Sequence, residues 1–168
     1  LVRGGVDNIM TYSNAQFVVL GSGDWEYEQF FKEMQAKYPG RFVLCQGFVP
    51  ELARKIYGGS DIFLMPSKSE PCGLSQMVAL RYGSIPVVRE TGGLKDSITD
   101  SGDGKGNGFT FQTYDTQDML NSVHRAIYAY NESKDGWKVL VERAMACDNS
   151  WGRSANDYIR LYKQLINS

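Results

Sequence analysis

Short apolar runs alternate with longer amphipathic segments along the chain. Each run is rich in Val, Ile, Leu or Phe and ends at a glycine, a proline or a polar residue, which predicts strands buried on both faces. These strands are expected over residues 16–21, 41–45, 61–65 and 85–88, with a shorter edge strand over 109–111. Apolar residues at helical spacing predict helices over about residues 24–37, 50–57 and 74–83, and through the last third of the chain.

Individual residues support these helices. Asp24 can cap the first one, with Met34 on its inward side. In the third helix Leu74 and Val78 share one side. Asp115 is favourable at the start of a later helix, because a carboxylate there accepts unpaired backbone N–H groups.

The order of these elements predicts an α/β fold. Strands that alternate with helices form a parallel sheet covered by helices on both faces, and no repeat interrupts the pattern. We therefore expect residues 1–168 to be a single doubly wound, Rossmann-like domain. In such sheets ligands bind beyond the carboxyl ends of the strands.

The composition and charge of the chain limit the classes of binding partner that we expect. The formal net charge of the 168 residues is −1 and the charges are interspersed, which argues against a nucleic-acid partner. No apolar run approaches the ~20 residues that span a bilayer, so no membrane partner is expected. The 3 cysteines lack metal-ligand spacing, which predicts free thiols in a reducing compartment and no bound metal. Because the chain begins at Leu1, we expect a piece of a longer protein.

Two glycine-containing loops carry the candidate chemistry. Residues 70–74 (E-P-C-G-L) follow the strand over 61–65, and residues 91–94 (T-G-G-L) follow the strand over 85–88. At the carboxyl ends of neighbouring parallel strands, both loops would direct backbone N–H groups at one crevice, which suits an anion such as a phosphate. Gly92 and Gly93 lack side chains where a phosphate would approach the backbone. An ordinary glycine turn is the alternative interpretation of each loop.

Single side chains suggest more specific roles. The Glu70 carboxylate could accept hydrogen bonds from sugar hydroxyls or stabilise positive charge at an anomeric carbon, or it could simply be solvated. Cys72 could be a nucleophile, but no base stands beside it, so packing or lining a ligand is favoured. Phe48 ends the second strand and could stack on a nucleobase or belong to the core.

A nicotinamide-dependent oxidoreductase is a weaker alternative. Gly21-Ser22-Gly23 resembles the start of a dinucleotide fingerprint, but Glu26 stands where the third glycine belongs. No acidic residue closes a second strand at the required place. We rank this hypothesis last.

Taken together, the segments resemble bacterial glycogen synthases and plant starch synthases. The resemblance covers nearly the whole chain, and the order and spacing of its motifs are specific. It is carried by F-V-V-L-G-S-G-D at 17–24, Q-G-F at 46–48, P-S-K-S-E-P-C-G-L at 66–74, R-Y-G-S-I-P-V-V-R-E-T-G-G-L-K-D at 81–96, G-F-T-F at 108–111 and S-W at 150–151.

The resemblance implies the C-terminal, nucleotide-sugar-binding half of a two-domain retaining glycosyltransferase. Such enzymes transfer glucose from ADP-glucose, or UDP-glucose in some members, to the non-reducing end of an α-1,4-glucan in glycogen or starch biosynthesis. They use no metal or other cofactor, and they reside in the bacterial cytoplasm or in a plant plastid. Whether the donor is ADP- or UDP-glucose stays open.

Site residues follow from the same resemblance. Glu70 matches the functional glutamate near the donor sugar, and Cys72, Gly73 and Leu74 match the loop that contacts the glucose hydroxyls. Phe48 matches an aromatic residue beside the adenine. The diphosphate loop is matched by Thr91, Gly92, Gly93 and Leu94. Val78 departs from the pattern, because wider relatives have a second glutamate there, and this leaves the ribose contact open.

Several family segments are expected to lie outside the chain. They are an acceptor-binding N-terminal domain, the first strand of this domain's sheet, and an R-L-T-x-Q-K-G-like segment whose Arg and Lys hold the diphosphate. Loss of the central first strand should leave a gap in the sheet or invite pairing with another chain. The terminal helix should expose an apolar patch near Trp151. We expect no transferase activity from these residues alone, and a non-catalytic nucleotide- or glucan-binding module is the alternative function.

Overall fold

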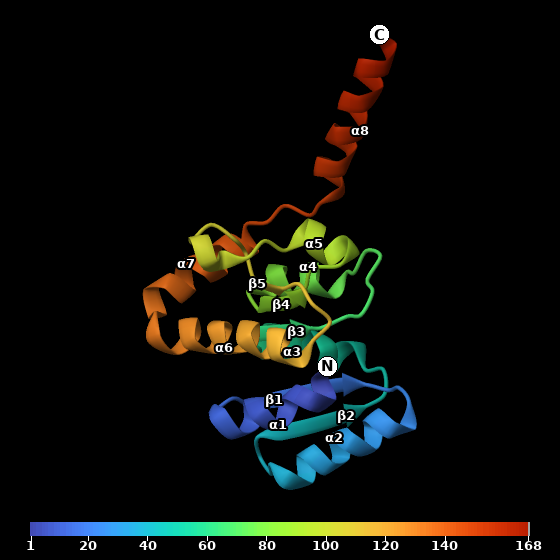
Figure 1. Ribbon diagram of the computed structural model, residues 1–168. Coiled ribbons are helices and arrows are strands. Elements are labelled where there is room, and N and C mark those ends of the chain that lie inside the picture. The colour runs from blue at the N-terminus through green and yellow to red at the C-terminus, as the bar shows by residue number, and fades with distance from the viewer. Residues whose placement is uncertain (168) are drawn as a thin grey trace.

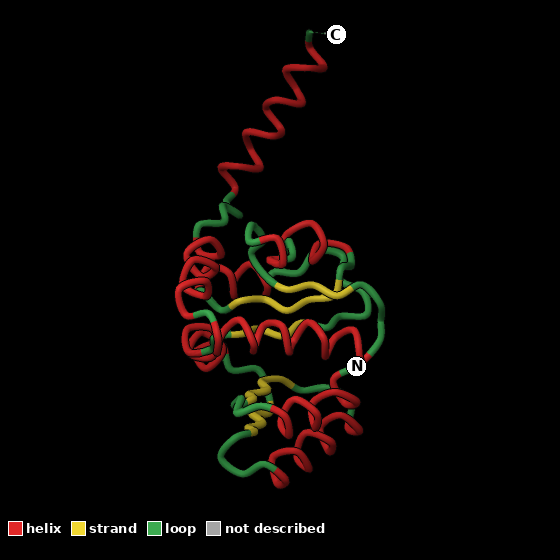
Figure 2. Tube along the Cα trace, turned by 60° about the vertical axis from the view of Figure 1, so that its left-hand side comes forward, coloured by secondary structure: helices red, strands yellow, loops and turns green. Residues whose placement is uncertain are grey.

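The computed structural model describes residues 1–167 and consists of parallel strands flanked by helices (Figure 1, Figure 2). This confirms the predicted α/β class. The strands are β1 (Phe17–Gly21), β2 (Phe42–Gln46), β3 (Ile62–Met65), β4 (Ile85–Arg89) and β5 (Phe109–Phe111). The helices are α1 (Val2–Tyr12), α2 (Trp25–Lys37), α3 (Pro50–Gly59), α4 (Ser75–Tyr82), α5 (Gly92–Ser97), α6 (Thr116–Glu132), α7 (Lys134–Met145) and α8 (Trp151–Ile166), with a 3₁₀ turn at Ser101–Asp103.

The larger sheet has the order β3-β4-β5, and all its strands are parallel. β4 is hydrogen-bonded on both edges, and all of its residues except Arg89 are buried. β5 is an edge strand, as predicted, although its three residues are buried. A continuous apolar core therefore lies around β4, between α4, α5, α6 and α7.

The smaller sheet contains only β1 and β2, paired in parallel from Phe17 opposite Phe42 to Gly21 opposite Gln46. It is not hydrogen-bonded to the larger sheet, and β1 and β3 each pair with a single neighbour. The single doubly wound sheet of the sequence prediction is thus divided. The division falls between β1 and β3, and Figure 2 shows the two groups of strands apart.

Helix α1 connects the two sheets. Its Ile9 belongs to the core around β4, whereas Val6 and Met10 form a second core with Met34 of α2 and Phe42 of β2. Met34 is therefore on the inward side of α2, as predicted. Ile9 and Met10 follow Val6 by three and four residues, so neighbouring strips of one helix contribute to both cores.

Two further helices, α6 and α4, can be compared with the sequence predictions. Asp115 caps α6 by accepting the N–H groups of Gln117 and Asp118, as expected. In α4, the side expected to carry Leu74 and Val78 faces solvent, because these residues are 68% and 37% exposed. The helix instead buries Gln76, Ala79 and Leu80 against the sheet.

Helix α8 projects from the rest of the molecule (Figure 1). Its apolar and aromatic side chains, including Trp151 at 87% exposure, lie at the surface, which confirms the patch expected near that residue. Within residues 1–167, no helix combines the length and the apolar character that crossing a membrane requires.

Candidate functional site

The two glycine-containing loops lie directly against each other. The Gly93 N–H donates to the Glu70 carbonyl oxygen at 3.1 Å. A Cβ on Gly92 would lie 2.1 Å from the same oxygen, and a Cβ on Gly93 would lie 1.9 Å from the Cys72 carbonyl oxygen. The missing side chains are therefore needed so that one loop can pack on the backbone of the other.

Glu70 and Cys72 both belong to the first of these loops and differ in exposure. The Glu70 carboxylate is half-buried, and the Ser67 hydroxyl approaches it only at 3.5 Å, the long limit of a hydrogen bond. The Cys72 thiol is exposed. His124, the single histidine of the sequence, bonds Asn8 at 2.9 Å between α6 and α1, so it is not a base for this thiol.

The remaining residues predicted for the loops differ in exposure. Gly73 has a φ of 73°, in the left-handed region where a glycine is favoured, and Leu74 is largely exposed after it. Thr91 precedes α5 as its N-cap residue and is half-buried. Leu94 is fully buried in the core around β4, and its N–H donates to the Thr91 carbonyl oxygen at 3.1 Å.

Arg89, which the sequence interpretation did not single out, holds the surrounding loops together. From the end of β4 its guanidinium donates to the carbonyl oxygens of Ser67 at 3.0 Å, of Lys68, and of Gln112 at 3.3 Å. The guanidinium also lies 5.8 Å from the centre of the Tyr114 ring. A basic residue at the end of a buried strand was the available signal for this role.

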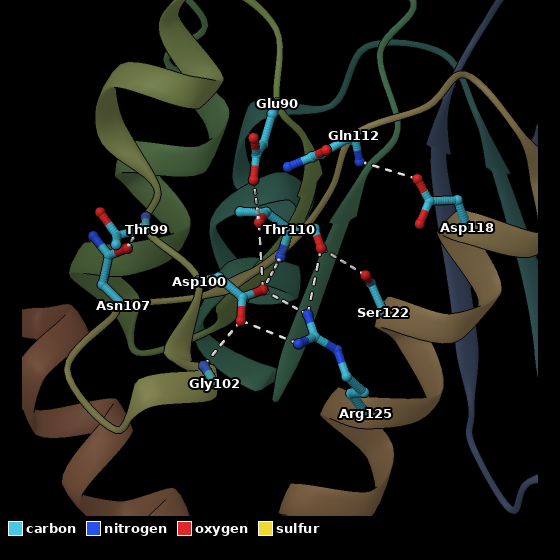
Figure 3. Close-up of polar contacts among 10 residues, drawn as sticks. All are labelled: Glu90, Thr99, Asp100, Gly102, Asn107, Thr110, Gln112, Asp118, Ser122 and Arg125. Carbon is cyan, nitrogen blue, oxygen red and sulfur yellow. Dashed lines mark hydrogen bonds and ion pairs between the residues drawn. The ribbon is translucent and has the colours of Figure 1, made fainter.

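Behind the loop of residues 91–94 lies a polar cluster (Figure 3). The Thr110 hydroxyl donates to the Glu90 carboxylate at 2.7 Å, and the Thr110 N–H donates to the Asp100 carboxylate at 2.8 Å. Arg125 of α6 forms an ion pair with Asp100 at 2.5 Å. The cluster thus ties Glu90, the residue that precedes Thr91, to β5 and α6.

The charge of Asp100 is stabilised by this cluster. Burial opposes ionisation of the carboxyl group and would raise its pKa. The hydrogen bonds from Arg125 and from the N–H groups of Thr110 and Gly102 outweigh burial, so the pKa of Asp100 lies below its ordinary value. The carboxylate is accordingly an anchor of the fold rather than a proton donor at neutral pH.

Phe48 lies apart from the two loops, after β2 in the smaller sheet. Its side chain is 91% exposed, which excludes the alternative of a core aromatic residue. Gly47 precedes it with a φ of 105°, a conformation that other residues rarely adopt. An exposed ring at a strand end keeps the nucleobase interpretation open.

The loop of Gly21 and Gly23 after β1 offers a poor phosphate site. The Gly23 N–H donates to the Glu28 carboxylate at 3.2 Å, and Glu26 adds a second negative charge in the first turn of α2. These carboxylates would repel a phosphate at that helix start. Among the described residues, no group of three or more His, Cys, Asp or Glu side chains could hold a metal ion.

Comparisons with known proteins identify relatives of this chain. The chain is similar to a protein named glycogen synthase from Geobacillus thermodenitrificans (strain NG80-2), with 52% identity over 159 residues. That alignment covers 94% of this chain and 33% of the relative. A glycogen synthase from Pseudothermotoga lettingae is 48% identical over 168 residues, which cover 99% of this chain and 34% of the relative. The chain therefore spans about a third of the length of these curated relatives.

Among solved structures, the catalytic domain of starch synthase IV from Arabidopsis thaliana, bound to ADP and acarbose, matches with a TM-score of 0.83 and 36% identity. The match covers 99% of this chain and 35% of that one. A sucrose-phosphate synthase from Thermosynechococcus elongatus has a TM-score of 0.66 at 20% identity over 96% of this chain and 41% of that one, which shows the fold alone. Residues 6–136 match the family model described as glycosyl transferases group 1. The chain therefore belongs to the group 1 family of glycosyl transferases.

Proposed function

We propose that this chain is the donor-binding part of a glycogen- or starch-synthase-type glucosyltransferase. The enzyme would transfer glucose from ADP-glucose, or from UDP-glucose, to the non-reducing end of an α-1,4-glucan with retention of configuration. The observation that carries the proposal is the docking of loop 70–74 on loop 91–94 at the carboxyl ends of β3 and β4. The similarity to proteins named glycogen synthase supports it.

Each loop would contact a different part of the donor. Glu70 would be the catalytic carboxylate near the glucose, where a negative charge favours positive charge developing at the anomeric carbon. Cys72, Gly73 and Leu74 would contact the glucose hydroxyls. Contact with the diphosphate would come from the loop of Thr91, Gly92, Gly93 and Leu94, and Phe48 would stack on the nucleobase.

The charge of the diphosphate would be balanced mainly from outside this chain. The guanidinium of Arg89, at the end of β4, already donates to three loop carbonyl groups. Removing a charge-stabilising donor costs about 10²–10³-fold in rate. We therefore propose that residues 1–168 bind the donor without measurable transfer, that no metal or other cofactor takes part, and that a further domain binds the glucan.

Calorimetric titration of the purified chain tests the proposal. ADP-glucose and ADP should bind saturably, and NAD should not. Glu70→Ala should weaken the binding of ADP-glucose more than the binding of ADP, because the carboxylate would face the sugar part of the donor. Gln164→Met, on the exposed surface of α8, is the control. Binding of NAD with no binding of ADP-glucose would contradict the donor site.

A radiolabel assay separates the enzyme from the non-catalytic alternative. Incorporation of glucose from ADP-glucose into glycogen should be undetectable with residues 1–168. It should appear when the chain is extended to the length of its relatives. Donor binding without turnover in the extended protein would favour a binding module.

A further inference from the structure

Gln76 is the one fully buried amide side chain of the core around α4, where its neighbours Ala79 and Leu80 are apolar. Its Nε2 group faces three acceptors. They are the Gly73 carbonyl oxygen at 2.9 Å, the Ser97 hydroxyl at 3.1 Å and the Cys72 carbonyl oxygen at 3.3 Å. One amide group of α4 therefore holds loop 70–74 and also reaches the end of α5.

Ser97 continues the chain of hydrogen bonds into the second loop. Its hydroxyl accepts from Gln76 and donates to the Gly93 carbonyl oxygen at 2.6 Å. The Gly93 N–H then donates to the Glu70 carbonyl oxygen at 3.1 Å. The path therefore runs from Gly73 through Gln76, Ser97 and Gly93 to Glu70, so it begins and ends on the loop after β3. Both backbone groups of Gly93 take part in it.

The orientation of the Gln76 amide follows from these contacts. A flipped amide would place its oxygen against the carbonyl oxygens of Cys72 and Gly73, which cannot donate. In the observed orientation the Oε1 atom is buried and is without a hydrogen-bond partner among residues 1–167. A buried acceptor without a donor lowers stability, and an apolar side chain of similar size would avoid that cost. The position therefore favours the amide for its donors rather than for packing.

We propose that Gln76, with Ser97 as its relay, is a positioning residue that docks loop 70–74 on loop 91–94. The loops then meet the nucleotide sugar as one preformed surface. This inference rests on the proposed function, because it assigns the glucose to the first loop and the diphosphate to the second. Gln76 is buried, so it acts through the backbone of the loops and does not touch the donor.

Hydrogen exchange of the ligand-free chain tests the docking without any donor. In Gln76→Met, exchange of the Gly93 amide should be at least ten-fold faster than in the unmodified chain, while exchange of the Val88 amide in β4 is unchanged. Gln164→Met makes the same chemical change on exposed α8 and should leave both rates unchanged. Unchanged exchange at Gly93, or equal acceleration at both amides, would overturn the proposal.

Ser97 provides a second, milder pair of variants. Ser97→Ala removes the relay and should accelerate exchange at Gly93 by several-fold. Ser97→Thr keeps a hydroxyl group and should restore the rate of the unmodified chain. An alanine variant that exchanges like the unmodified chain excludes the relay, even if Gln76→Met does not fold.

Titration calorimetry then measures the consequence for binding. Of these two loops, ADP would contact only the second, whereas ADP-glucose would contact both. Gln76→Met should therefore lower the affinity for ADP-glucose about ten-fold and the affinity for ADP less than three-fold. A general loss of structure would lower both affinities alike. Equal weakening contradicts the coupling of the loops. Failure of the unmodified chain to bind ADP-glucose would count against the proposed function, and the exchange rates would still decide the docking.

Discussion

Strands β1 and β4 have similar apolar sequences but different surroundings. β4 is paired on both edges and is buried except at Arg89, whereas β1 pairs only with β2 and leaves Val18 45% exposed. The main core lies around β4, and the core beside β1 and β2 is much smaller. The apolar pattern thus identifies a strand, but the number of its neighbours decides how much of it is buried.

The loops that follow these strands differ in the same way. After β4, Gly92 and Gly93 lie against the backbone of another loop. After β1, a Cβ added to Gly23 would have no atom within 4 Å. A pair of glycines therefore marks a tight loop contact in the larger sheet and an open turn in the smaller one.

The largest expected effect compares valines on the two strands. Val87→Ala, at a position with 0% exposure, should lower the free energy of unfolding by about 2–3 kcal/mol through lost burial and a cavity. Val18→Ala should cost less than about 1 kcal/mol. Urea denaturation measures both. Equal losses would show that β1 is as well packed as β4.

Alanine at the glycines sharpens the contrast between the loops. Gly93→Ala should destabilise the fold by about 1–3 kcal/mol, because its Cβ would overlap the Cys72 carbonyl oxygen. It should also abolish ADP-glucose binding. Gly23→Ala, with open space around it, should stay within about 0.5 kcal/mol of the unmodified chain. A Gly93→Ala variant of normal stability and affinity would contradict the tight docking of the loops.

The third comparison concerns two ion pairs. Asp100→Asn, in the cluster behind β4, should lower stability by about 1–2 kcal/mol, because the carboxylate accepts several hydrogen bonds there. Since the pKa of Asp100 is lowered in the fold, its contribution is present above about pH 4 and is lost as the pH falls through the folded-state pKa. The variant should therefore show a weaker loss of stability in acid.

Asp7, paired with Lys37 between α1 and α2, is the matched control. Its pKa is also lowered, by hydrogen bonds from Lys37 and Tyr38, but both partners of the ion pair are exposed to solvent. Asp7→Asn should therefore change stability less than Asp100→Asn does. Chemical denaturation at pH 3, 5 and 7 measures both variants. If Asp7→Asn lowered stability more than Asp100→Asn, the cluster around Asp100 would not be the stronger of the two.

The smallest effect is a difference in thiol reactivity. Cys72, on the exposed loop after β3, should be alkylated several-fold faster than the half-buried Cys45 of β2. Mass spectrometry after brief treatment with iodoacetamide gives both rates. ADP-glucose should slow the reaction at Cys72 alone, and equal protection of both thiols would argue against a local contact.

Much of the fold could be predicted because its signals are local. The strand ends, the cap at Asp115 and the inward side of Met34 depend on residues close in sequence. The face of α4 could not be predicted, because exposed Leu74 and Val78 look like core residues and the buried Gln76 looks like a surface residue. The roles of Arg89 and Asp100 were missed for a related reason. Arg89 donates to Ser67 and Lys68, more than twenty residues away, and Asp100 is bonded to Thr110, ten residues away, and to the more distant Arg125.

The sequence by itself determined the class of fold, the family resemblance and the two loops with their glycines. Those features depend on residue types at short spacing, which the chain carries whatever its partners are. Only the tertiary structure decided that the sheet is divided, that the glycines admit a neighbouring backbone, and that Gln76 and Ser97 connect the loops. Burial and hydrogen bonding between distant segments depend on which surfaces come into contact in the folded chain. The pattern of residues along the sequence does not specify those contacts.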